Sequence, residues 1–146
     1  SFEMTVLFYD PYVKGSEKDL VTMAKKCNVL SINAVANNGT KGLVDLEVLS
    51  ALPKNAIVVN TARGEILELN ALLDLLESGH LWGAALDTID GEYDMKFNDN
   101  FFTSRVATYA RENDNLILTP HIGGSTIDAW TETEERVIKK SIEILC

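Results

Sequence analysis

The side chains best suited to chemistry in this chain each follow a short apolar run. Arg63 comes after the run 56–60, and His121 comes shortly after another run that ends at Leu118. Asp87 closes the run Gly83-Ala-Ala-Leu, and Glu92 follows it by five residues. A guanidinium binds carboxylates through a forked pair of hydrogen bonds, and an imidazole exchanges protons near neutral pH. These groups together predict a site that holds a small anionic substrate and moves a proton.

The elements that must position these groups are buried parallel strands. Their apolar runs are rich in β-branched residues and alternate with amphipathic segments, such as the one with leucines at 69, 72, 73 and 76. Strands that alternate with helices predict an α/β fold, in which a doubly wound parallel sheet is covered by helices on both faces in three layers. The expected strands are residues 5–9, 28–33, 56–60, 81–86 and 115–118, and the expected helices are residues 17–26, 45–52, 69–77 and 125–145, with a polar and aromatic insertion at 90–114.

A family resemblance rests on four motifs that occur in one order. Residues 60–64 read NTARG, residues 83–87 read GAALD, Glu92 follows, and residues 119–126 read TPHIGGST. This series resembles the NAD-binding domain of the NAD-dependent D-isomer-specific 2-hydroxyacid dehydrogenases, over about residues 4–145. The resemblance implies a Rossmann-like sheet and an oxidoreductase that transfers a hydride between NAD and a small D-2-hydroxy acid or 2-oxo acid.

The resemblance also implies three catalytic roles. Arg63 orients the substrate, His121 is the acid and base, and Glu92 holds His121 through one imidazole nitrogen. Asp90 is the alternative partner of His121, since it lies in the same loop as Glu92. His80, the other histidine, follows Ser-Gly at a helix end and is expected to be an exposed helix-terminal residue.

The predicted cofactor is NAD. Asp10 ends its expected strand where the adenosine ribose would lie, and a carboxylate there favours NAD over NADP; an Asp-Pro pair is equally a common turn signal. Asp87 is expected to contact the nicotinamide carboxamide, or else to satisfy local backbone amides. Asn33 stands where many relatives carry histidine. The full expected set is Asp10, Asn33, Thr61, Ala62, Arg63, Asp87, His121, Gly123 and Gly124.

The glycine-rich turn that usually opens a dinucleotide-binding fold is not found in this sequence. We therefore expect residues 1–146 to be a partial NAD-binding domain, incomplete at its N-terminus and without a substrate domain. The first strand of such a sheet is central. We expect its place to lie between two groups of strands, with those at 5–9 and 29–33 on one side and the remaining strands on the other. We expect one of three outcomes. The missing part lies outside this sequence, the two half-sheets close directly on each other, or another copy of the chain supplies the pairing.

The net charge and the cysteines limit the partners and the cellular compartment that the sequence predicts. The 146 residues carry a net charge of −9, which argues against binding to nucleic acid or an anionic membrane. No apolar run is long enough to span a bilayer, and no metal-ligand spacing occurs. Cys27 and Cys146 are expected to be free thiols in a cytoplasmic protein. The long last helix suits either packing or dimerisation, and a homodimer of the full-length protein is expected.

Two other functions remain open from the sequence. Some relatives of this fold act as NAD-responsive corepressors, so the chain is alternatively a binding module without turnover. The other alternative is a fragment that is inactive and binds NAD poorly on its own. The segment from Glu92 to His121 is several residues longer than in phosphoglycerate dehydrogenases and looks closer to D-lactate dehydrogenases, while HIGG is closer to the former. The sequence therefore predicts the reaction class and leaves the acid itself open.

Overall fold

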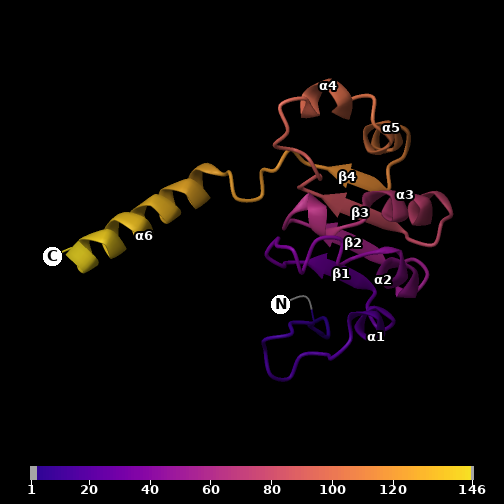
Figure 1. Cartoon of the computed structure of the whole chain (residues 1–146), viewed down its shortest axis with the longest axis horizontal. Coiled ribbons are helices and arrows are strands. Elements are labelled where there is room, and N and C mark those ends of the chain that lie inside the picture. The colour runs from indigo at the N-terminus through magenta and orange to yellow at the C-terminus, as the bar shows by residue number, and fades with distance from the viewer. Residues whose placement is uncertain (1–2, 146) are drawn as a thin grey trace.

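A parallel sheet of four strands forms the centre of the structure, a computed structural model that describes residues 3–145 (Figure 1). Neighbours in the sheet are also neighbours in sequence, in the order β1-β2-β3-β4. The register pairs Ile32 with Asn60, Asn60 with Leu86, and Leu86 with Leu118, so the carboxyl ends of all four strands meet at one edge. The strands are β1 (Val29–Ile32), β2 (Ile57–Asn60), β3 (Gly83–Leu86) and β4 (Leu116–Leu118).

Helices connect the strands, as the sequence predicts. The Asp45 side chain accepts from the Val48 N–H at 3.0 Å and begins the second helix, and the leucine-rich helix covers the same residues as predicted, Leu69–Glu77. The helices are α1 (Leu20–Ala24), α2 (Leu46–Ala51), α3 (Leu69–Glu77), α4 (Phe97–Phe101), α5 (Arg105–Glu112) and α6 (Ile127–Leu145), with a short 3₁₀ turn at Gly64–Ile66. The Rossmann-like parallel α/β fold is thereby confirmed.

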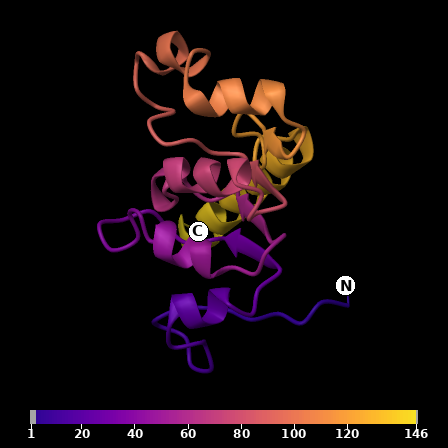
Figure 2. The same ribbon diagram turned by 90° about the vertical axis from the view of Figure 1, so that its right-hand side faces the viewer.

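The helical layer lies on one face of the sheet. Helix α1 contacts α2, α2 contacts α3, and α3 contacts α5, so that these helices form a single row (Figure 2). Burial alternates along β1, where Leu30 and Ile32 are buried while Val29 and Ser31 are exposed. Residues 3–145 therefore build two layers, and the expected third layer is not formed among them. The physical reason is that α6, the longest helix, has no buried residue and extends away from the sheet (Figure 1).

The prediction for the N-terminal strand is wrong. Residues 5–9 form no strand and pair with none in the described part of the chain, and Val6 is exposed. The strand predicted at 28–33 pairs directly with β2, which agrees with the expected alternative in which the two parts of the sheet close on each other. The apolar run at 5–9 has strand propensity, but propensity alone does not make a strand without pairing, and the outer edge of β1 stays unpaired among the described residues.

Two helix starts also differ from the prediction, and the predicted insertion contains helices. The first helix starts after Asp19, whose carboxylate accepts from Thr22 N–H, because the Ser16 hydroxyl instead donates to the Asp10 carbonyl. The last helix is capped by Thr126, which accepts from Ala129 N–H, rather than by Ser125. The insertion at 90–114 contains α4 and α5, with buried side chains on α5.

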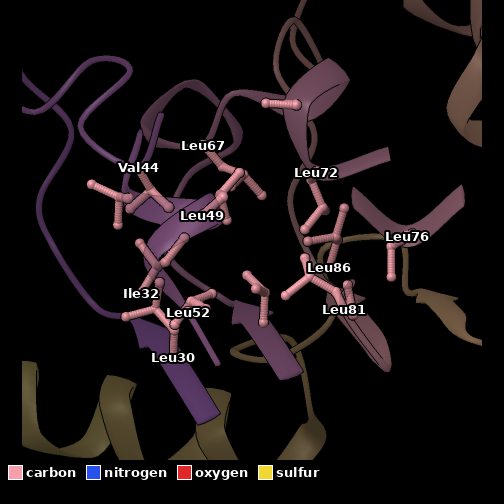
Figure 3. Packing of buried hydrophobic residues seen from close by; sticks show 14 of the residues in the cluster. Leu30, Ile32, Val44, Leu49, Leu52, Leu67, Leu72, Leu76, Leu81 and Leu86 are labelled. Carbon is pink, nitrogen blue, oxygen red and sulfur yellow. The ribbon is translucent and has the colours of Figure 1, made fainter. Parts of the chain in front are cut away.

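The core fills the space between the covered sheet face and the row of helices. Leucines from β1, α2, α3 and β3 point toward one another there (Figure 3). Among them, Leu49, Leu72 and Leu86 are almost fully buried. Packing of this kind on one face fixes the strand register, since a slip by one residue would turn each strand inside out. The core therefore holds the carboxyl edge of the sheet in place.

Two further expectations concern the surface. Cys27 is a free, partly buried thiol that donates to the Met23 carbonyl, whereas Cys146 lies outside the described residues. Within residues 3–145, no helix combines the length and the apolar character needed to cross a bilayer.

Candidate active site

The loops that follow β2, β3 and β4 begin side by side at the carboxyl edge of the sheet. They carry Arg63, Glu92 and His121 respectively. Because the strands are parallel and in register, the loop after β3 leaves the sheet between the loops after β2 and β4. The edge that the sequence predicts to carry the chemistry is the edge at which these residues lie.

Close backbone contact joins the first two of these loops. A Cβ atom on Gly64 would lie 2.1 Å from the backbone nitrogen of Asp90 and 2.1 Å from the carbonyl carbon of Ile89. No side chain fits into such a gap, so only glycine permits this approach. The loop of Arg63 therefore packs against the loop that leads to Glu92.

The imidazole of His121 and the carboxylate of Glu92 form the central contact of the site. His121 Nδ1 lies 2.8 Å from Glu92 Oε1, and the side chains are 32% and 14% exposed. The backbone of His121 has a φ of 52°, which is uncommon for a residue other than glycine. Asp90, the alternative partner, is exposed and makes no hydrogen bond to His121. The structure pairs His121 with Glu92.

Arg63 presents its guanidinium at the same edge. The side chain is exposed, and its Nη1 donates to the Ala62 carbonyl at 2.7 Å. No carboxylate in residues 3–145 forms an ion pair with it. The remaining donors of the guanidinium fork are available for a ligand.

Asn60 holds the Arg63 loop, and the sequence reasoning missed this role. Its side chain is fully buried, accepts from Ala62 N–H at 3.0 Å and donates to the Arg63 carbonyl at 3.0 Å. A buried amide with both ends bonded to one loop fixes the path of that loop. The available signal was an asparagine at the end of an otherwise apolar strand, where a buried polar side chain must find partners.

A hollow of about 430 Å³ opens beside Arg63. It lies between the end of β1 and the loop after β2, and its walls are mostly small or apolar residues. Such walls suit a flat aromatic ring with one polar edge, and the exposed guanidinium borders the space. The structure thus brings together four of the predicted residues. The lining residues are Asn33, Ala34, Val35, Ala36, Thr61, Ala62 and Arg63.

Asp87 anchors the loop that carries His121. It is 7% exposed, and its carboxylate accepts from Thr119 Oγ1 at 2.5 Å and from the backbone N–H groups of Ile122 and Gly123, each at 2.9 Å. A Cβ on Gly123 would lie 2.9 Å from Asp87 Oδ2, so this contact too requires glycine. These bonds lie on both sides of His121. Of about four lone-pair positions on the carboxylate, one on Oδ2 is left for a ligand.

The same bonds set the acidity of Asp87. Burial opposes its charged form, but the hydrogen bonds from Thr119, Gly123 and Ile122 outweigh burial and hold the pKa of this carboxyl below its ordinary value. The charged carboxylate therefore stabilises the fold above the unfolded-state pKa of about 4. This stabilisation is lost as the pH falls through the lower pKa of the folded state.

We expect Asp87→Asn to lower the free energy of unfolding by about 2 kcal/mol at neutral pH, because a neutral amide accepts these hydrogen bonds less strongly. Urea unfolding across a series of pH values measures the effect. The difference between wild type and variant should shrink as the pH falls below about 4. Asp114→Asn, an exposed acid, is the matched control and should leave the unfolding curve unchanged. An equal loss at all pH values would contradict this account of Asp87.

Two predicted cofactor residues lie apart from these contacts, and one histidine differs from expectation. The Asp10 side chain accepts from Tyr12 N–H at 2.9 Å, which is the Asp-Pro turn that the sequence left open. Gly124 faces open space. His80 follows the C-terminal end of α3, but it is partly buried and its Nε2 lies 2.9 Å from the Leu52 carbonyl oxygen, so it is not freely exposed.

Comparison with known proteins now identifies the class to which the fold and the site belong. The family model of the D-isomer-specific 2-hydroxyacid dehydrogenase NAD-binding domain matches residues 1–123. The chain belongs to this family, and the predicted family, Rossmann-like fold and NAD cofactor are confirmed.

Individual relatives agree with this assignment. The chain is 37% identical over 135 residues to D-3-phosphoglycerate dehydrogenase of Haemophilus influenzae, covering 88% of this chain and 32% of the relative. It is 36% identical over 112 residues to formate dehydrogenase of Arabidopsis thaliana, covering 77% and 27%. The apo structure of D-mandelate dehydrogenase of Rhodotorula graminis matches with a TM-score of 0.75 and 26% identity, covering 90% and 38%. The chain thus spans about a third of the length of these relatives.

Proposed function

We propose that this chain is the part of an enzyme that transfers a hydride between NAD and a small D-2-hydroxy acid or its 2-oxo acid. The observation that carries the proposal is the pair of His121 Nδ1 and Glu92 Oε1 at 2.8 Å, together with the close packing of the loop that leads to Glu92 against the loop that bears Arg63. A carboxylate on one imidazole nitrogen, with a guanidinium on a neighbouring loop, suits proton transfer to an anionic carbonyl compound.

The nicotinamide supplies or accepts the hydride when NAD is bound. In this chain, an Nδ1–H that donates to Glu92 leaves His121 Nε2 with a free lone pair. Nε2 takes the hydroxyl proton of the hydroxy acid during oxidation and returns it to the carbonyl oxygen during reduction. The Glu92 carboxylate lies against the positive charge that the ring gains. The catalytic residues are therefore Arg63, Glu92 and His121.

The remaining residues of the edge fit the binding of NAD. Asn33, Thr61 and Ala62 would hold the nicotinamide end, since they line the hollow beside Arg63. Asp87 would offer its remaining lone pair to the carboxamide, and Asp10 would bind the ribose. Gly123 and Gly124 would lie along the cofactor next to His121.

Arg63 gives the direct test of substrate binding. In the full-length protein, Arg63→Lys should lower kcat/KM for a 2-oxo acid roughly 10- to 100-fold, mostly through KM, because an ammonium cannot make the forked pair of bonds. Oxidation of NADH measures this rate. Arg136→Lys is the matched control on exposed helix α6 and should leave kcat/KM unchanged. An unchanged KM in Arg63→Lys would remove Arg63 from the site.

A substrate panel tests the function itself. We expect the full-length protein to reduce NAD with D-2-hydroxy acids and to be inactive with the L enantiomers. Calorimetry with NAD, run in parallel, separates the alternatives. Binding of NAD without turnover of any acid in the panel would favour an NAD-responsive binding module. Tight binding by the 146 residues alone would contradict the expectation that they bind NAD poorly.

We also propose that the full-length protein is a homodimer that acts in the cytoplasm and binds neither nucleic acid nor membrane. The net charge of −9 supports the last point. The exposed apolar residues of α6, such as Trp130, Ile138 and Ile142, support self-association. Most of the acidic residues of α6 lie at 128–135 and its basic residues at 136–140, so two antiparallel copies would place the acidic stretch of one opposite the basic stretch of the other. Sedimentation velocity tests this, and a monomer at micromolar concentration would contradict it.

A further inference from the structure

Two consecutive residues reach the same nitrogen of His121. Nδ1 lies 2.8 Å from Glu92 Oε1 and 3.3 Å from the Tyr93 hydroxyl oxygen. The rings of Tyr93 and His121 are tilted by 59° with centroids 6.1 Å apart, so the hydroxyl meets the edge of the imidazole and the rings do not stack. Tyr93 is 76% exposed, whereas the Glu92 side chain is 14% exposed.

Glu92 and Tyr93 differ in whether they need a proton on Nδ1 of His121. A charged Glu92 carboxylate only accepts hydrogen bonds, so it binds only the tautomer that carries its proton on Nδ1. A tyrosine hydroxyl both donates and accepts. It can accept from Nδ1–H beside Glu92, and it can donate to Nδ1 when the proton sits on Nε2. The hydroxyl can therefore hold the ring in either tautomer.

The backbone alone does not explain the position of the imidazole. His121 has a φ of 52°, and its loop is tied to Asp87 through Thr119, Ile122 and Gly123. Those bonds fix the main chain but leave the side-chain torsions free. Glu92 and Tyr93 are the residues in the described part of the chain that hydrogen-bond the His121 ring.

We propose that Tyr93 is a positioning residue for the acid and base of this site, sharing Nδ1 of His121 with Glu92. The inference rests on the proposed function of His121. In this arrangement the Glu92 carboxylate and the Tyr93 hydroxyl together set the direction in which Nε2 points. The carboxylate binds only one tautomer of the ring, and the hydroxyl can bind both. Tyr93 does not contact the hydride or the proton that is transferred. It acts through the orientation of the His121 imidazole.

The test removes only the hydroxyl. In the full-length protein, Tyr93→Phe should lower kcat about fivefold, the effect of one hydrogen bond, and change KM by less than about twofold. In a Glu92→Gln background the loss from Tyr93→Phe should be larger, because the neutral amide no longer selects one tautomer. Tyr12→Phe, an exposed tyrosine of the N-terminal turn, is the matched control and should change neither parameter. A raised KM with unchanged kcat would overturn the proposal, since it would place Tyr93 in substrate binding.

A spectroscopic measurement separates this inference from the proposed function. The chain has two histidines, so side-chain ¹⁵N NMR of the 146 residues reports the tautomer of His121, with His80 as an internal reference. We expect Tyr93→Phe in the Glu92→Gln background to change the ratio of the His121 tautomers and to leave His80 unchanged. An unchanged ratio would overturn the role of Tyr93. This readout needs no turnover, so the proposed function can fail in the enzyme assay while the Tyr93 contact holds.

Discussion

Replacing His121 with asparagine is expected to lower kcat about 10²- to 10⁴-fold in the full-length protein, the usual contribution of a general acid or base. An asparagine amide does not take up a proton, so neither direction of the reaction has a proton carrier. The KM for the 2-oxo acid should change little, because we propose that Arg63 is the residue that binds its carboxylate. Steady-state rates of NADH formation and oxidation measure both parameters.

His80 provides the matched control for this variant. His80→Asn removes the contact with the Leu52 carbonyl and is expected to cost about 1 kcal/mol of stability without an effect on kcat. Unfolding curves of both variants show whether a loss of rate is only a loss of folded protein. Retention of the wild-type kcat by His121→Asn would contradict the assignment of the acid and base.

The second large effect is expected at Gly64. In Gly64→Ala the new methyl group would overlap the backbone of Ile89 and Asp90, since the distances are 2.1 Å. Backbone atoms cannot rotate away as a flexible side chain can, so one of the two loops must move. Overpacking of this kind costs about 1–3 kcal/mol and occasionally more. We expect about 3 kcal/mol, measured by urea unfolding, together with a lower kcat/KM as Arg63 and Glu92 move apart.

Gly124→Ala is the control for Gly64→Ala. A Cβ at Gly124 meets nothing within 4 Å, and its backbone is not in the left-handed region. Its free energy of unfolding should stay within about 0.5 kcal/mol of the wild type. If both alanine variants behaved alike, the close contact between the two loops would not be the feature that requires glycine.

The part of the site that the sequence could predict is the part carried by local pattern. Apolar runs that end in polar residues placed Arg63, Asp87 and His121 at one edge, because parallel strands share the direction of their ends. The choice of Glu92 over Asp90 needed the resemblance, since two acids of one loop are equivalent in composition. The structure shows the physical difference: the backbone of Asp90 packs on Gly64, while Glu92 reaches Nδ1 of His121.

The rest depended on which segments meet in space. Residues 5–9 carry strand propensity, but the pairing of β1 with β2 cannot be read from either segment alone. The two hydrogen bonds from the Asn60 side chain to the Arg63 loop were missed for the same reason, since the sequence does not show the path that this loop takes. Helices α4 and α5 lay within a stretch that its polar and aromatic composition marked as an insertion.

Asn60 and Asp87 have one consequence for the redesign of this enzyme class. Both are buried and hold their loops largely through main-chain N–H groups, which every residue except proline retains. Of the residues that line the hollow, Ala62 and Arg63 bond to Asn60, whereas Asn33 and Val35 on the opposite wall take no part in those bonds. An engineer can therefore randomise positions 33–36 as a library while the scaffold underneath the loops stays constant.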